Sequence, residues 1–101
     1  MDPVLEPKLV NRLTDLLTIL SKKDALTIFL LAKDGLKAEA DASEKIGLTR
    51  KQYYTRLKQL VDTGLIDKYD DAYVHTTLGT FVHQKHLLEL IEQVKNSEQM
   101  K

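Results

Sequence analysis

The 101-residue sequence contains no cysteine, only two prolines and four glycines, and no excess of charge of either sign. Without cysteine, the chain has neither a disulfide framework nor a thiolate metal site. The longest runs of apolar residues, such as residues 28–32, are far too short to cross a bilayer. The N-terminus lacks the basic segment and apolar stretch of a secretory signal, so we expect a cytoplasmic protein without a membrane partner.

The composition, 43% hydrophobic and 30% charged, is that of a globular chain rich in helix-forming residues. Its length suits one domain over residues 1–101 and is too short for two independent cores. Fifteen basic and fifteen acidic residues cancel, which argues against indiscriminate binding to nucleic acid. The charges are unevenly placed, however, because residues 45–61 include five basic residues and no acidic one.

Apolar spacing predicts two helices in the first third of the chain. Pro7 suits the first turn of a helix over residues 7–22, in which leucines recur at intervals of three and four residues. Asp24 is expected to cap a second helix, which Gly35 closes. The expected inward face of this second helix comprises Ala25, Ile28, Phe29 and Ala32.

A shorter helix over residues 39–46 precedes the clearest boundary in the sequence. Thr49 and Gln52 have the spacing of a capping box, in which each side chain satisfies a backbone N–H of the other residue. They predict a helix over residues 49–63 that ends before Gly64. Its expected inward face comprises Tyr53, Leu57, Leu60 and Val61.

The pattern changes from helical to strand-like after this helix. Residues 65–69 and 73–76 are rich in β-branched and aromatic side chains. They flank the acidic turn residues Asp70 and Asp71, which predicts a short hairpin.

Thr76 can cap a last helix over residues 77–95, and the polar tail 96–101 is expected to fray. The predicted fold class is therefore mainly α with a small β-hairpin. It has about five helices and a two-stranded wing, in the order that a winged helix-turn-helix needs.

Three fragments resemble winged helix-turn-helix transcriptional regulators of the archaeal ArsR-like and MarR-like type. Residues 41–49 (DASEKIGLT) are similar to their "ELAEKLGLS" segment, and residues 73–79 (YVHTTLG) to the end of the wing in archaeal members. The stretch over residues 53–66 is similar to their "V-x-x-x-L-x-x-L-x-x-x-G-L-V" pattern. The similarity covers roughly residues 24–82. It implies a homodimeric regulator, cytoplasmic and nucleoid-associated, that binds pseudo-palindromic double-stranded DNA.

The helix over residues 49–63 supplies the candidate DNA contacts, because a recognition helix exposes donors and cations while its other face is held in the core. Arg50 is the candidate for bidentate guanine readout, and Gln52 either only caps the helix or also reaches an adenine edge. The alternative for the basic residues is a solvated helix face, the usual meaning of a charge run. The predicted DNA-binding residues are Thr49, Arg50, Lys51, Gln52, Tyr54, Thr55, Arg56, Lys58, Lys68, Tyr69 and Tyr73.

The wing departs from the pattern of these regulators. Wing tips that touch DNA usually carry arginine or lysine, whereas Asp70 and Asp71 would repel phosphates. Either the wing is too short to reach the DNA backbone, or it serves a protein contact.

No motif predicts catalysis or a cofactor. The sequence shows no nucleophile–base pair and no glycine-rich phosphate loop, so we expect a protein that is not an enzyme. His83 and His86 lie three residues apart, with Glu89 a further three along. A zinc site needs three or four ligands, so we expect surface or interface histidines and no metal. His75 is expected to pack or pair locally.

The terminal helices carry more apolar residues than one small core can cover. In the last helix, Leu78, Phe81 and Leu88 lie nearly opposite the face that contains Leu90. Either the monomer covers both faces, or the helices over 7–22 and 77–95 form a homodimer, which we favour and the resemblance implies. The predicted interface comprises Leu9, Leu13, Leu16, Leu20, Leu87, Leu90, Ile91 and Val94.

Sequence-specific DNA binding is thus the leading functional prediction. The alternative is a winged-helix module that binds a protein partner in a transcription or replication assembly. Zero net charge and the acidic wing favour this alternative.

Overall fold

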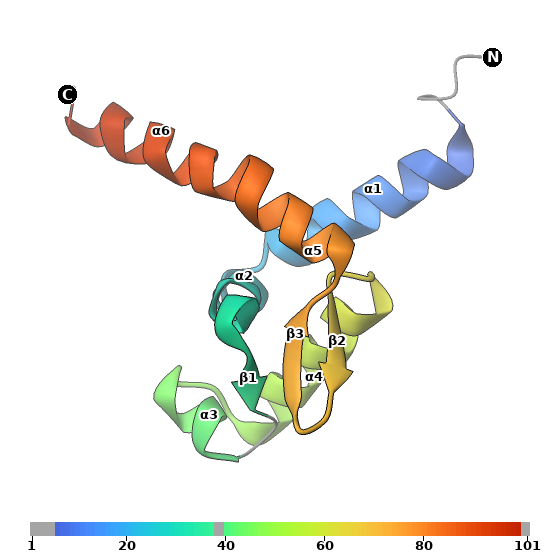
Figure 1. Ribbon diagram of the computed structural model, residues 1–101, viewed down its shortest axis with the longest axis vertical. Coiled ribbons are helices and arrows are strands. Elements are labelled where there is room, and N and C mark those ends of the chain that lie inside the picture. The colour runs from blue at the N-terminus through green and yellow to red at the C-terminus, as the bar shows by residue number, and fades with distance from the viewer. Residues whose placement is uncertain (1–5, 38–39, 100–101) are drawn as a thin grey trace.

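The computed structural model describes residues 6–37 and 40–99, which form a mainly helical domain with a three-stranded antiparallel sheet (Figure 1). The first half contains α1 (Pro7–Leu20), α2 (Lys23–Leu31), the 3-10 turn η2 (Ala32–Asp34), β1 (Leu36–Lys37) and α3 (Ala40–Lys45). The second half contains α4 (Arg50–Asp62), β2 (Ile66–Tyr69), β3 (Ala72–His75), α5 (Thr77–Phe81), η3 (Val82–Leu87) and α6 (Leu88–Gln99). No helix in these described parts is long and apolar enough to span a bilayer.

The core lies where α2 and α4 pack together and against the start of β2. The inward faces predicted for the two helices are confirmed, except that Val61 is only partly buried. Because both helices present a continuous apolar stripe, each holds the other in a fixed orientation. The buried apolar residues are Ile19, Ala25, Ile28, Phe29, Ala32, Tyr53, Leu57, Leu60, Leu65 and Ile66.

The sheet has the strand order β1-β3-β2, with both pairs antiparallel. The predicted hairpin is confirmed, with a turn in which Asp70 has a φ of 56°, a left-handed conformation that aspartate tolerates. The prediction of two strands is incomplete. A third strand, β1, joins the sheet, and its Leu36 pairs with Tyr73. A two-residue strand is too short to show alternation in the sequence.

Two of the three predicted helix caps are confirmed. The capping box of α4 is complete, with Thr49 Oγ1 accepting from the Gln52 amide at 3.1 Å and Gln52 Oε1 accepting from the Thr49 amide at 3.0 Å. Thr76 caps α5 through the Gly79 amide. The prediction for Asp24 is wrong, because α2 begins at Lys23 with Lys22 as its N-cap, two residues before the predicted cap. A contact with α4, described below, explains this aspartate better.

The C-terminal helix is continuous but not uniformly α-helical. The segment η3 is π-helical, and Gly79, His83, Leu87 and Ile91 recur every four residues on the side that faces the rest of the domain. At Gly79 an added Cβ would collide with the Leu65 carbonyl, so the helix approaches the body as closely as a backbone allows. Within the tail expected to fray, residues 96–99 continue α6 as a helix, and residues 100–101 lie outside the described part.

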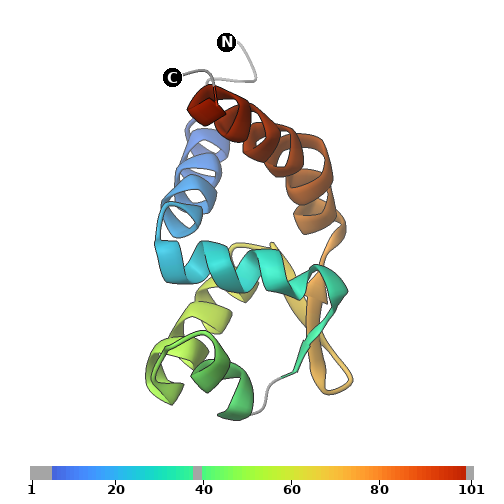
Figure 2. The same ribbon diagram turned by 90° about the vertical axis from the view of Figure 1, so that its left-hand side faces the viewer.

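The outer helices α1 and α6 diverge from the body in different directions (Figure 1). In the perpendicular view both lie at the end of the molecule opposite α3 and the tip of the β2–β3 hairpin (Figure 2). The fold therefore separates a helical end from an end that carries the start of α4 and the hairpin turn.

Candidate nucleic-acid interface

One face of α4 is buried and the other is exposed and basic. Tyr53 and Leu57 are fully covered, whereas Lys51, Thr55 and Lys58 form an exposed stripe with spacings of four and three residues. Arg50 and Tyr54 are exposed beside this stripe. The structure thus brings five of the predicted contact residues onto one surface, defined here as the basic face: Arg50, Lys51, Tyr54, Thr55 and Lys58.

Tyr53 fixes the roll of α4 about its own axis. Its hydroxyl donates to the Lys37 carbonyl at 3.1 Å, which ties α4 to β1. Burial raises the pKa of Tyr53 to about 12, so the phenol remains a donor at neutral pH. The ring of Tyr54 meets that of Tyr53 edge-on at 5.6 Å. The basic face is therefore held by a contact on its opposite side.

Gln52 is exposed, but its side-chain oxygen is committed to the Thr49 amide. Bidentate readout of adenine needs both the oxygen and the nitrogen of a glutamine amide. Such a contact would break the capping box, so the two predictions for this residue compete for one atom.

Arg56 lies apart from the basic face and packs toward α2. Its Nε donates to Asp24 Oδ2 at 2.8 Å, and its Nη1 donates to Gln59 Oε1 at 2.8 Å. This hydrogen bond from Arg56 holds the pKa of the Asp24 carboxyl below its usual range. The arginine predicted as a DNA contact is already engaged in joining α4 to α2.

The hairpin tip is acidic and strongly exposed. Tyr69 is 74% exposed, and Lys68, Asp70 and Asp71 are also exposed, whereas Tyr73 is half-buried within the sheet. The tip and the start of α4 lie toward the same end of the molecule (Figures 1 and 2). Negative charge thus lies at the same end of the molecule as the start of α4.

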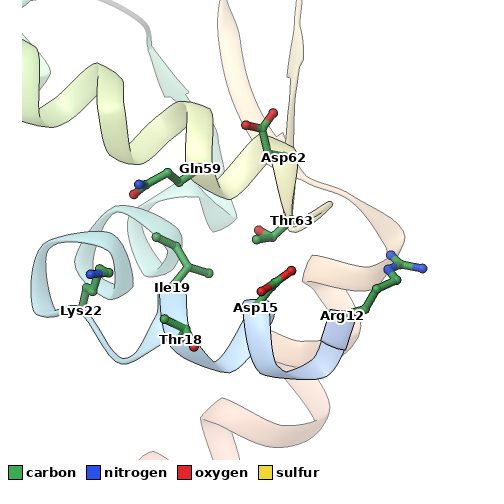
Figure 3. A pocket seen from close by; sticks show the side chains of 8 residues that line it. All are labelled: Arg12, Asp15, Thr18, Ile19, Lys22, Gln59, Asp62 and Thr63. Carbon is green, nitrogen blue, oxygen red and sulfur yellow. The ribbon is translucent and has the colours of Figure 1, made fainter. Parts of the chain in front are cut away.

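The C-terminal half of α4 has a different character. It borders a cleft of about 320 Å³ against α1, in which Asp15 of α1 and Asp62 of α4 contribute carboxylates (Figure 3). The carboxylates of Asp15 and Asp62 share the cleft with the cations Arg12 and Lys22, so it carries no excess of positive charge to attract a phosphate. The cleft is lined by Arg12, Asp15, Thr18, Ile19, Lys22, Gln59, Asp62 and Thr63. The acid-free part of the exposed α4 surface therefore ends before Asp62.

The histidine predictions are partly wrong. His83 is only 7% exposed, and its ring lies 5.3 Å from that of His75 and edge-on to Phe29. Its placement on the Gly79–Leu87 repeat could have signalled burial. His75 packs locally as expected, stacked on Phe29 with its Nε2 2.7 Å from the Phe29 carbonyl oxygen. Over residues 6–37 and 40–99, no three histidine or carboxylate side chains are grouped to hold a metal ion.

The predicted dimer residues fall into two groups. Leu16, Leu20 and Leu87 pack against the monomer core, so part of the apolar surplus is covered within one chain. Ile91 is half-buried, and the exposed members are Leu9, Leu13, Leu90 and Val94.

No family model, curated protein or solved structure matches the chain.

Proposed function

We propose that this chain is a winged helix-turn-helix protein that binds double-stranded DNA as a homodimer, with α4 in the major groove. The observation that carries the proposal is the basic face, which is free of acid while the opposite side of the same helix is buried. A helix can read the major groove only if one side is anchored and the other presents donors and cations.

The surrounding elements support this proposal. The order α2, α3, α4 and then an antiparallel hairpin corresponds to a three-helix unit followed by a wing. The first turn of α4 contains no acidic residue, so the positive end of the helix dipole adds to the charges of Arg50 and Lys51.

The proposed roles differ along the basic face. Lys51 and Lys58 contact phosphates, which supplies salt-dependent affinity but little selectivity. Arg50 reads a guanine edge, and Tyr54 and Thr55 contact neighbouring bases or sugars. Arg56 positions α4 on α2 rather than touching DNA.

The test is an anisotropy titration of a labelled random-sequence duplex at two salt concentrations. Wild-type protein is expected to bind at micromolar concentration, with affinity that falls steeply as salt rises. Changing Arg50, Lys51 and Lys58 to alanine should abolish binding. A matched variant that removes three exposed cations elsewhere, Lys8, Lys33 and Lys85, should retain it.

A protein-interaction module is the second candidate, favoured by the acidic and exposed hairpin tip. Asp70 and Asp71 would repel phosphates, and Tyr69 offers a large exposed ring of the kind enriched at protein interfaces. Absence of DNA binding at low salt, by wild-type protein shown to be folded in the same sample, would favour this candidate.

A further inference from the structure

A cavity of about 470 Å³ lies between the start of α2 and the turn that joins α3 to α4. None of the five residues of the basic face lines it, so it is a separate feature of the surface. Its volume falls within the usual range of small-molecule pockets, about 300–1,000 Å³. The cavity is therefore large enough for a small organic ligand.

The lining of this cavity carries an excess of positive charge. Lys22, Lys23 and Arg56 contribute three cations, whereas a single carboxylate, that of Asp24, is present. Both oxygens of this carboxylate are engaged, Oδ1 by the Ala25 amide at 2.8 Å and Oδ2 by Arg56 Nε at 2.8 Å. Lys22 also borders the α1–α4 cleft, yet the one ion pair within residues 6–37 and 40–99 is that of Asp24 with Arg56. The charges of the two lysines are therefore uncompensated.

Arg56 retains hydrogen-bond donors beyond those that it uses within the chain. A guanidinium group has five N–H donors. Two of them are engaged, one from Nε to Asp24 and one from Nη1 to Gln59. The side chain is only 23% exposed, so it is held in place at the wall of the cavity. A fixed guanidinium with donors to spare suits an anion with several oxygens.

Another part of the lining is apolar. Ile46 and Leu48 belong to the turn between α3 and α4, where both are half-buried and pack against the core. A hydrated inorganic ion gains nothing from such a wall, whereas the apolar body of an organic molecule is removed from water there. The cavity therefore fits a molecule that joins an anionic group to an apolar body.

Charge and oxygen number favour a phosphate monoester over a carboxylate as the anionic group. A phosphate monoester carries a charge of about −1.5 to −2 at pH 7 and three strongly accepting oxygens. Its charge matches the two uncompensated lysines, and its oxygens match the three cationic side chains of the lining. A carboxylate offers only one negative charge and two oxygens.

We propose that this cavity binds a small organic phosphate monoester. Lys22, Lys23 and Arg56 hold the phosphate, and the apolar body of the ligand packs on Ile46 and Leu48. The site goes beyond the proposed DNA contact and does not depend on it. Because the ligand binds the folded chain only, its binding stabilises the fold.

An NMR titration with phenyl phosphate tests the site, with the methyl groups of Ile46 and Leu48 as reporters. Phenyl phosphate should shift both in a saturable manner, with a dissociation constant on the order of a millimolar or below. Inorganic phosphate lacks the ring, phenol lacks the charge, and benzoate lacks the second charge. Each should bind at least about tenfold more weakly. Equal affinity for any of the three would overturn the assignment of a phosphate monoester.

Lysine-to-methionine changes test the charges while retaining most of each side chain. The double variant Lys22→Met/Lys23→Met should weaken binding of phenyl phosphate about tenfold or more. Lys33→Met/Lys85→Met removes two exposed lysines outside the cavity and should keep the wild-type affinity. Equal losses in the two double variants would contradict the site, because they would show a general attraction of the anion to a basic surface.

A matched pair of variants separates the cation of Arg56 from its structural link to α2. Arg56→Gln and Asp24→Asn both break the ion pair, but only Asp24→Asn keeps the guanidinium. Arg56→Gln should therefore lose affinity for phenyl phosphate, and Asp24→Asn should bind it at least as tightly as the wild type. Similar losses in both variants would contradict a direct contact between Arg56 and the phosphate.

A labelled duplex distinguishes this cavity from the DNA-binding surface. Random-sequence duplex should shift the amides of Lys51 and Thr55 and leave the methyl groups of Ile46 and Leu48 in place. Displacement of phenyl phosphate by the duplex would overturn the proposal, because the cavity would then be part of the DNA contact. The titration with phenyl phosphate needs no DNA, so its result is independent of whether the basic face binds a duplex.

Discussion

His75 and His83 lie against each other at the joint between β3 and the C-terminal helix, with ring centroids 5.3 Å apart. His75 is stacked on Phe29 of α2, and His83 is the buried member of the pair. A charge on the buried His83 ring would be poorly solvated here, so this joint favours the neutral form of His83.

The burial of His83 at this joint predicts that the free energy of unfolding falls in weak acid. Burial, followed by the nearby charges of His75 and Lys33, lowers the pKa of His83 below its usual 6.5, while Asp34 acts in the opposite direction. The unfolded chain therefore binds this proton more readily than the folded one. The stabilisation is complete above about pH 6.5 and is lost as the pH falls toward the lowered pKa.

The measurement is the thermal unfolding midpoint at a series of pH values from 7.5 to 5. The midpoint should drop by roughly 2–5 °C more in the wild type than in His83→Phe. Gln84→Ala, a change at an exposed and non-titrating position of the same helix, should leave the wild-type pH profile unchanged. Identical profiles for the wild type and His83→Phe would rule out His83 as the source.

Gly79→Ala is expected to destabilise the fold by about 1–3 kcal/mol, because the new Cβ would meet the backbone carbonyl of Leu65, which cannot turn aside. Gly47→Ala is the matched control. Gly47 has a φ of 73° but open space around it, so alanine there adds only backbone strain, about 1 kcal/mol. Urea unfolding should rank Gly79→Ala as the more costly of the two; the reverse order would contradict the close approach of α5 to Leu65.

The Asp24–Arg56 pair predicts a stability effect without a change in DNA readout. Each side chain is 23% exposed, so Asp24→Asn and Arg56→Gln should each cost about 1 kcal/mol and should not add in the double variant. The salt slope of DNA binding should be the same for Arg56→Gln and wild type. If Arg56→Gln reduced the salt slope of DNA binding and Asp24→Asn did not, Arg56 would be a DNA contact after all.

Arg50 and Lys58 should differ in what their removal does. Arg50→Ala is expected to relax specificity for a selected operator, with a loss of about 1–3 kcal/mol on that site only. Lys58→Ala should weaken binding to all sequences alike and reduce the salt slope by about 1. Competition titrations of operator against random duplex measure both quantities, and equal losses for both variants would refute this division of roles.

Local signals explain which parts of the fold could be predicted from the sequence. Thr49, Gln52 and Gly64 define the ends of α4 through interactions within a few residues, and the apolar period of α4 defines its buried side. These features depend on backbone chemistry that any chain shares. The basic face could therefore be predicted closely.

Contacts distant in sequence explain the failures. Asp24 and Arg56 are 32 residues apart, and each has a sensible local interpretation, one as a helix cap and the other as a DNA contact. The strand β1 exists only because β3 offers an edge for two residues. His83 is buried because Phe29 and His75 come to it from two other elements. In each case the neighbouring residues in the sequence give no indication of the distant partner.

The π-helical segment η3 determines which face of α6 is turned toward the rest of the domain. A π-helical turn holds one residue more than an α-helical turn for nearly the same rotation about the axis. Deleting one residue within η3 should therefore restore α-helical hydrogen bonding while α5 and α6 keep the faces that they turn toward the body. A single deletion within the regular α-helix α6 has no such reserve, and it would rotate the residues beyond it by about 100°.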